Sequence, residues 1–416
     1  MERQIESYRR YGLLLIGLAL LMGCSVTRKT LKLPSSFVDR NLQDAIGQYK
    51  VLQTNVEEGL LPKTFSSKTG EVINGHNRLW TAGFYIGTLW YLYEFSGDQA
   101  LRAEAERKLP ILEEQQFSTR THDLGFMLYC SYGNAWRLTG DERYRDILMT
   151  GATSLITRYN PTVKSIRSWD QTRGKWTFPV IVDNMMNLEY LNWASRVSGD
   201  PKYGDIAVTH ANTTLKNHFR PDYSSYHVID YDPETGAVLH KHTHQGFADE
   251  SAWARGQAWG LYGFTMMYRD TRNKEFLKQA RHIADFILGH PNLPEDKIPY
   301  WDFNADAIPN ALRDASAGAI MASALLELST YVRGAASRRY LCAAESMIRS
   351  LSAAPYKVES GVKGGFILQH SVGSFPGNSE VDVPLTYADY YYVEALMRYK
   401  RMLEGKGLFD RIGKKD

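Results

Sequence analysis

Two aspartates, Asp123 and Asp183, have the residue type and spacing of a pair that could exchange protons with a substrate. Each stands at the start of an apolar segment with helical periodicity. If both segments begin on one face of the protein, the two carboxylates meet at one mouth. A neighbouring negative charge raises the pKa of a carboxyl group, so one member can hold a proton while the other stays ionised. Aspartate is also a preferred N-cap, and both residues could merely cap their helices.

A second group combines a charge with an aromatic ring. Arg255 and Trp259 are four residues apart, so on a helix they share a face. The arginine could pair with an anionic or hydroxyl-rich ring while the indole stacks on it, although such a pair is more often an ordinary contact between helices. His240, His242 and His244 alternate and would project from one side of a strand. No cysteine or carboxylate cluster offers a fourth ligand for zinc, so we expect no metal.

The elements that must position these residues are helical hairpins, because one phrase recurs at helix ends. Glycine suits the left-handed position that stops a helix, and the aspartate after it can cap the next one. The phrase occurs at Phe95-Ser96-Gly97-Asp98, Leu138-Thr139-Gly140-Asp141 and Val197-Ser198-Gly199-Asp200. The intervals between these turns leave room for two helices each.

Six segments should start on the same side of such hairpins. They begin near Trp80, Asp123, Asp183, Trp253, Asp314 and Asp389. Six hairpins that close on themselves make an all-α fold, an (α/α)6 barrel, whose inner helices begin on one common face. Strand-like runs are scarce. Residues 226–231 and 236–240 could form one minor β-hairpin on a long loop.

The N-terminus has the pattern of an export signal. Arg9 and Arg10 precede an apolar stretch of about ten residues, which is too short to span a bilayer. The stretch ends in Leu21-Met22-Gly23-Cys24, which looks like a bacterial lipobox, so we expect a lipid on Cys24. We divide the chain into a signal peptide (1–23), a tether (24–36), a catalytic barrel (37–405) and a C-terminal tail (406–416).

The charge balance excludes some partners. The chain carries a formal net charge of +3. Residues 1–23 contribute three arginines and two glutamates to this charge. A nearly neutral body gives no sign of a nucleic-acid partner, and contact with a membrane is expected only through the lipid. The tether has no acidic run after Cys24, which favours an outer-membrane protein facing the periplasm of a bacterial cell envelope. Cys130 and Cys342 lie in apolar helical stretches and are expected to be buried free thiols, with a disulfide as the alternative.

Several motifs in consistent order resemble the unsaturated glucuronyl hydrolases of glycoside hydrolase family 88. They are Leu79-Trp80-Thr81-Ala82-Gly83-Phe84, His122-Asp123-Leu124-Gly125-Phe126, Val182-Asp183-Asn184-Met185-Met186-Asn187-Leu188, Thr243-His244-Gln245-Gly246, Trp253-Ala254-Arg255-Gly256-Gln257-Ala258-Trp259 and Tyr387-Ala388-Asp389-Tyr390-Tyr391. The resemblance implies an enzyme without a cofactor that removes a 4,5-unsaturated uronic acid from the end of an oligosaccharide, with glycosaminoglycan-type fragments favoured. Such enzymes protonate C4 and add water at C5, rather than displacing the glycosidic bond directly.

The resemblance also assigns roles to residues. It implies that Asp183 is the general acid and base and that Asp123 is a second essential carboxylate, which binds ring hydroxyls. The other residues that it implies at the substrate are Trp80, His227, Thr243, Gln245, Arg255, Trp259, Ser371 and Ser374. One departure concerns a Ser-x-x-Ser-x-Lys pattern of members that prefer sulfated fragments, because Pro376 stands where they have lysine. Binding of a 6-sulfated sugar is therefore in doubt.

Three other interpretations remain at this point. An unsaturated rhamnogalacturonyl hydrolase, acting on pectin fragments, would share the barrel but usually has Asn-Gly where this chain has Gln257 and Ala258. An epimerase of N-acylated sugars would need paired histidines in place of Asp123 and Asp183. A non-catalytic glycan-binding lipoprotein would keep the aromatic residues and Arg255 without needing both carboxylates.

Overall fold

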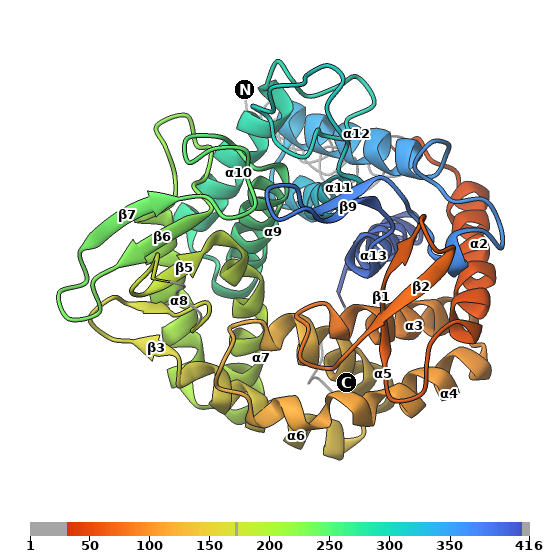
Figure 1. The fold of residues 1–416 in the computed structure, drawn as a ribbon, viewed down its shortest axis with the longest axis horizontal. Coiled ribbons are helices and arrows are strands. Elements are labelled where there is room, and N and C mark those ends of the chain that lie inside the picture. Colours follow the sequence, from red (N-terminus) through yellow and green to blue (C-terminus); the bar gives the residue numbers. More distant parts are fainter. Residues whose placement is uncertain (1–30, 171–173, 410–416) are drawn as a thin grey trace, which may run out of the picture.

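The computed structural model describes residues 31–170 and 174–409, in which helices alternate between an inner and an outer ring (Figure 1). The inner ring contains α3 (Ala82–Ser96), the π-helix η2 (Gly125–Gly133) continued by α5 (Asn134–Thr139), α7 (Leu188–Ser198) after the 3-10 turn η3 (Val182–Asn187), α9 (Ala254–Thr271), α11 (Ala315–Tyr331) and α13 (Thr386–Leu403). The outer ring contains α2 (Ser35–Thr54), α4 (Gln99–Lys108), α6 (Glu142–Ile156), α8 (Pro201–Asn217), α10 (Lys274–Gly289) and α12 (Gly334–Leu351). This arrangement confirms the predicted (α/α)6 barrel.

Burial explains which helix lies in which ring. Every residue of α11 from Ala315 to Ser329 is buried, because inner helices contact neighbours on all sides. The outer helix α10 buries one stripe only, at Phe276, Gln279, Ala280, Ile283, Ala284 and Ile287. The polar opposite face of such a helix can remain in water.

The turns between helices form as the repeated phrase predicts. Gly97, Gly140 and Gly199 end their helices with φ values of 69°, 68° and 74°, a left-handed conformation that glycine adopts without strain. Asp98, Asp141 and Asp200 then accept a hydrogen bond from the second residue of the next helix. Of the predicted inner starts, Trp253 and Asp314 are the N-caps of α9 and α11. Asp389 instead lies within the first turn of α13, so that helix starts earlier than predicted.

The barrel is closed by its first and last helices, which run antiparallel. The Leu33 N–H donates to the hydroxyl of Tyr399 near the end of α13, at 3.0 Å. At the other end, the hydroxyl of Tyr49 in α2 lies 3.5 Å from Oδ2 of Asp389. The outer helix α2 therefore begins at the end of the barrel where the inner helices finish.

Short hairpins surround the opposite end, where the inner helices begin (Figure 1). The predicted hairpin is present as β6 (Val228–Tyr231) and β7 (Val238–His242), with Val228 paired to His242, and β5 (Pro179–Ile181) joins it as a third strand. Three further hairpins were not predicted: β1 (Leu61–Ser66) with β2 (Glu71–Gly75), β3 (Tyr159–Asn160) with β4 (Ser165–Ile166), and β8 (Ser371–Ser374) with β9 (Ser379–Val383).

An aromatic layer crosses the inside of the barrel and separates two cavities. Phe126 contacts Trp80 and Trp259 with ring centroids 5.4 and 5.2 Å apart, and Trp259 contacts Tyr391 at 5.5 Å. The smaller cavity, about 280 Å³, lies where the inner helices begin, and the larger, about 640 Å³, lies toward their C-terminal ends. Phe126 lines both cavities. No helix within residues 31–170 and 174–409 is long and apolar enough to cross a membrane.

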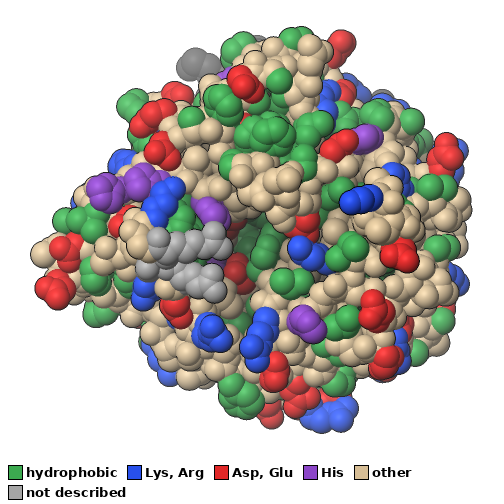
Figure 2. All heavy atoms as spheres, in the orientation of Figure 1, with side chains coloured by type: hydrophobic (Ala, Val, Ile, Leu, Met, Phe, Trp, Pro, Cys, Tyr) green, Lys and Arg blue, Asp and Glu red, His purple; other side chains and the backbone are tan. Residues whose placement is uncertain are grey.

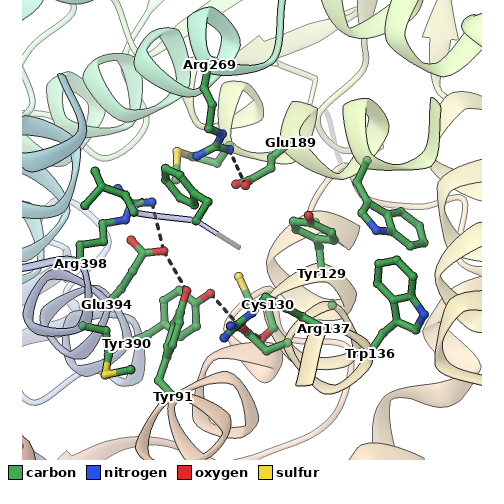
Figure 3. A pocket seen from close by; sticks show the side chains of 18 of the residues that line it. Tyr91, Tyr129, Cys130, Trp136, Arg137, Glu189, Arg269, Tyr390, Glu394 and Arg398 are labelled. Carbon is green, nitrogen blue, oxygen red and sulfur yellow. Dashed lines mark hydrogen bonds and ion pairs between the residues drawn. The ribbon is translucent and has the colours of Figure 1, made fainter. Parts of the chain in front are cut away.

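The larger cavity, which we call the rear cavity, has its charges paired across its walls. Figure 3 shows Arg269 directed at Glu189, 2.5 Å away, and Glu394 between Arg398 and Tyr91. Phe409 from the C-terminal segment packs against two of these arginines, with its ring centroid 4.1 Å from Arg269 and 4.8 Å from Arg398. These contacts link α7 to α9 and α3 to α13 across the rear cavity.

Candidate active site

The smaller cavity brings the two predicted aspartates together. It opens near the centre of the face in Figure 2, where the surface is hollowed. Its lining residues come from five inner segments, from the β8–β9 hairpin, and from the loops that precede β5 and follow β7: Trp80, His122, Asp123, Phe126, Trp169, Ile181, Asp183, His244, Gln245, Arg255, Gly373, Ser374, Ser379, Glu380 and Tyr387. The common face expected for the inner-helix starts is therefore where this cavity lies.

Asp183 occupies the first turn of η3, directly after β5, and is only 7% exposed. Its Oδ2 has no hydrogen-bond partner among the described residues and lies 3.6 Å from Nε2 of His227. Burial raises the pKa of Asp183 to about 7, and the charge of Asp123 adds to the rise against the opposing effect of Arg255. At neutral pH this carboxyl group can therefore both give and take a proton.

Asp123 has the opposite environment. Burial pushes its pKa upward, but His122 and the hydroxyl of Thr121 outweigh burial and leave the pKa below its ordinary value. The Thr121 hydroxyl donates to Oδ2 at 2.6 Å, and Nε2 of His122 lies 3.1 Å from Oδ1. Asp183 can therefore act as the acid, while Asp123 beside it stays ionised.

Helix capping does not account for either aspartate. The described contacts of the Asp123 carboxylate come from Thr121 and His122, which precede it in the chain. Asp183 has one oxygen with no described partner. By contrast, Asp314 accepts hydrogen bonds from the N–H groups of Ser316 and Ala317 and is a true N-cap.

His227 stands behind Asp183 and is held in one orientation. Its Nδ1 accepts the N–H groups of His244 at 3.1 Å and Gln245 at 3.2 Å. The ring proton is therefore on Nε2, which points at Asp183. Burial, followed by neighbouring positive groups, holds the pKa of His227 well below its ordinary value, so the ring is neutral. Its Nε2–H is a neutral donor that lies 3.6 Å from the carboxyl group, just beyond hydrogen-bond distance, and it is not a second acid.

Arg255 lines the cavity, but its guanidinium is already bound to protein. It donates to the carbonyl of Val372 and, at 2.6 Å, to that of Gly373, and one nitrogen lies 3.3 Å from Asp314. Arg255 therefore ties the β8 strand to α9 and α11. Its remaining Nε has no described partner.

Trp259 lies away from the cavity walls. It is fully buried in the aromatic layer, between Phe126 and Tyr391, because its position on α9 points toward the barrel axis one turn below Arg255. It does not line the cavity, so the expected stacking on a sugar is replaced by support of Phe126, which does line it.

The other predicted residues divide between wall and support. Trp80, Gln245 and Ser374 line the cavity. The hydroxyl of Thr243 accepts the Gly246 N–H at 2.8 Å and shapes the loop that carries Gln245. Ser371 is fully buried in β8, behind the lining residues.

Several lining residues were not among the predicted site residues. His122 and Tyr387 lie within the quoted motifs, and His244 within the histidine alternation, so their neighbours already marked them. Nothing in the sequence marked Glu380 as a site residue. It adopts a φ of 56°, which is unusual for a side chain other than glycine, and its Oε1 lies 3.4 Å from Lys63. Only its place on β9, opposite Gly373, brings it to the cavity.

The predicted thiols and histidines do not add a second chemical centre here. Cys130 and Cys342 are free, the first buried and the second half-buried. The rings of His240 and His242 stack at 5.2 Å, and Nδ1 of His242 accepts the indole N–H of Trp176 at 3.1 Å. No group of three metal-ligating residues occurs within the described ranges.

An (α/α)6 barrel with an acid and an ionised carboxylate in one cavity defines a glycoside-hydrolase type of protein. The family described as Glycosyl Hydrolase Family 88 matches residues 59–288. An unsaturated glucuronyl hydrolase of Formosa agariphila is 44% identical over 94% of this chain and 98% of its own length. The chain belongs to the unsaturated glucuronyl hydrolases of glycoside hydrolase family 88.

Solved structures agree with this assignment. That of an unsaturated glucuronyl hydrolase specific for heparin is 50% identical, with a TM-score of 0.86, and the match covers 91% of this chain and 100% of that one. That of the enzyme responsible for glycosaminoglycan degradation in Bacillus sp. GL1 is 31% identical, with a TM-score of 0.83 and coverage of 91% and 100%.

Proposed function

We propose that this enzyme removes the non-reducing-end 4,5-unsaturated uronic acid from lyase-generated fragments of the glycosaminoglycan type. The observation that carries the proposal is the pair of carboxyl groups whose pKa values are driven apart in one cavity, Asp183 upward and Asp123 downward. The relatives specific for heparin and responsible for glycosaminoglycan degradation support the substrate class.

The chemistry follows from the enol ether of the unsaturated ring. Asp183 donates its proton to C4, and water adds at C5 while returning a proton to the Asp183 carboxylate. The product is a hemiketal at C5, which opens to a ketone and leaves a hemiacetal at C1. Collapse of that hemiacetal releases the remaining sugar as an alcohol. His227 steadies the carboxylate form of Asp183, and the ionised Asp123 accepts hydrogen bonds from ring hydroxyls.

The test is loss of the ultraviolet absorbance of the enol ether across a panel of unsaturated disaccharides. The panel contains chondroitin-, hyaluronan- and heparin-type products, and unsaturated pectin fragments as the competing class. We expect turnover of at least one glycosaminoglycan-type disaccharide and none of its saturated counterpart, which offers no double bond to protonate. Comparable release of uronic acid from the saturated sugar would contradict the mechanism.

We also propose that the protein is a lipoprotein of the bacterial envelope, acylated on Cys24 and facing the periplasm. Cys24 and the signal pattern before it lie outside the described residues, so the support is the sequence motif alone. Cys24→Ser should release the enzyme into the soluble periplasmic fraction. Rapid loss of the wild-type protein when intact cells are treated with protease would show surface display instead.

A further inference from the structure

Three aromatic side chains form a surface at the mouth of the cavity, which we call the aromatic platform: Phe247, Trp301 and Phe375. Phe247 and Phe375 are among the most exposed large apolar residues of the described chain, at 43% and 45%, whereas Trp301 beneath them is 3% exposed. Phe375 stacks on Trp301 with ring centroids 4.6 Å apart and an interplanar angle of 22°. Phe247 meets the same indole edge-on at 6.3 Å.

The platform is continuous with the catalytic cavity. Phe375 directly follows Ser374, and Phe247 comes two residues after Gln245; both Ser374 and Gln245 line the cavity. The Gln245 amide donates to the carbonyl of Gly373 at 2.9 Å, so the two loops that carry the rings are joined at the cavity wall. Figure 2 shows hydrophobic side chains gathered beside the central hollow.

The platform is also held rigidly. The Phe247 N–H donates to Oδ2 of Asp302 at 2.9 Å, and the Ser251 hydroxyl donates to the same oxygen at 2.7 Å. The Trp301 N–H donates to the carbonyl of Leu312 at 2.9 Å. Because Trp301 covers one face of the Phe375 ring, the exposed part of that ring presents a flat apolar surface whose orientation is fixed before any ligand arrives.

Exposed apolar surface next to a site needs a reason, because contiguous apolar patches on soluble proteins mark places of binding. The cavity of about 280 Å³ is slightly smaller than the roughly 300–1,000 Å³ usual for ligand pockets. A cavity of this size has no room for a long sugar chain, so the remainder of such a chain must leave at the mouth. The C–H face of a pyranose ring is flat and apolar, which suits an aromatic ring with one free face.

We propose that the aromatic platform binds the third sugar ring of an unsaturated oligosaccharide by stacking, so that the enzyme prefers fragments longer than disaccharides. This inference rests on the proposed function of the cavity. It adds a binding site beyond the rings that the cavity holds, and it assigns Phe375 as the main contact and Phe247 as its neighbour.

The test measures equilibrium binding by calorimetry, in an Asp183→Asn background that prevents turnover. The ligands are an unsaturated disaccharide and the tetrasaccharide of the same repeat. We expect the tetrasaccharide to bind more tightly, and Phe375→Ala to reduce that preference about three- to tenfold. Phe247→Ala should reduce it less, and Phe375→Tyr, which keeps the ring, should retain it.

The matched control is Leu239→Ala, an equally exposed apolar residue on β7 that is not part of the platform. It should leave the preference unchanged. Equal affinity for the two sugars in the parent protein, or a preference that survives loss of both phenylalanines in variants with a native circular dichroism spectrum, would overturn the inference. Failure of the proposed function is detected separately, because it appears as an absence of disaccharide turnover in the absorbance assay with unmutated enzyme.

Discussion

At the scale of single residues, the two aspartates differ in pKa because their environments differ, although the residue type is the same. Asp183 has an oxygen without a described partner, whereas Asp123 is flanked by a hydroxyl and an imidazole. Burial deprives an ionised carboxyl group of the hydration that stabilises it in water, and only hydrogen bonds or charges can replace that hydration. The difference in local contacts therefore makes one residue the proton donor and leaves the other charged.

Asp183→Asn should abolish proton transfer while preserving the fold. General acid–base catalysis contributes about 10²–10⁴-fold, so kcat should fall by at least that factor. Asparagine keeps the shape and removes a carboxyl group that is costly to bury when ionised, so the melting temperature at pH 8 should be equal or higher. Steady-state kinetics with thermal melts test both statements. A variant that keeps most of its turnover at an unchanged melting temperature would disprove the acid/base assignment.

The raised pKa of Asp183 also predicts how the wild type responds to pH. The protonated form is the acid, so kcat/KM should decline as pH rises through about 7. The pKa is raised in the folded state, so the stability that this group contributes is complete below its unfolded value of about 3.9 and is lost as pH rises through about 7. Melts between pH 4 and 8 on the wild type and Asp183→Asn should show this component only in the wild type. A kcat/KM that keeps rising above pH 8 would contradict the assignment.

At the scale of elements, Asp314 joins three parts of the site. It caps α11, lies 3.3 Å from the Arg255 guanidinium, and accepts the Val372 N–H of β8 at 3.4 Å. Arg255 in turn holds the carbonyls of β8. The strand that brings Ser374 to the cavity is therefore positioned by a helix cap on α11 and a side chain on α9.

Asp314→Ala should affect stability and substrate binding together. It removes a cap and leaves a buried guanidinium without its carboxylate, and breaking a buried ion pair in this way costs about 3–5 kcal/mol. We expect a melting temperature several degrees lower and a raised KM, because β8 loses a tie. Asp141→Ala is the matched control, since Asp141 caps the outer helix α6 at an exposed site. If both variants changed alike in melting temperature and in KM, the coupling of Asp314 to β8 would be excluded.

At the scale of the whole molecule, the aromatic layer separates the catalytic cavity from the rear cavity. Phe409 closes part of the rear cavity against Arg269 and Arg398. Phe409→Ala should lower stability by about 1–2 kcal/mol, from lost cation–π contact and apolar burial, and shift the melting temperature by a few degrees. The value of kcat/KM should not change, because Phe126, Trp259 and Tyr391 lie between the two cavities. Phe117→Ala, at a residue 68% exposed, is the control for melting. A drop in kcat/KM with Phe409→Ala would show that the layer transmits the change.

The barrel could be predicted from sequence because its turns are local. A glycine that ends one helix and an aspartate that caps the next act within a few residues, so Gly140 and Asp141 could be recognised without the fold. Apart from the hairpin of β6 and β7, the short hairpins could not be predicted in the same way, because two-stranded sheets are marginal alone and form where the barrel rim supports them.

The site residues also divide into those that local sequence identifies and those that depend on the tertiary structure. Asp123 and Asp183 were recognisable because their positions at helix starts determine where they point. Arg255 lines the cavity, as a residue expected to meet the sugar should, but its bonds to backbone carbonyls more than a hundred residues away follow from no spacing rule. Trp259 shares a helix face with Arg255, but one turn moves it from the mouth into the aromatic layer. Helical periodicity predicts which face of a helix a side chain occupies. How deep that side chain lies along the barrel axis depends on the tertiary structure.

The antiparallel pairing of α2 with α13 has a consequence for how the enzyme would sit on a lipid surface. Because α2 starts beside the end of α13, the segment that leads back to Cys24 joins the barrel at the rear, opposite the mouth. Twenty helical residues set the two ends of α2 about 30 Å apart. A lipid on Cys24 would then hold the rear toward the headgroups and turn the mouth toward the aqueous phase. Sugar chains would enter from open solution, without having to pass the narrow gap between protein and bilayer.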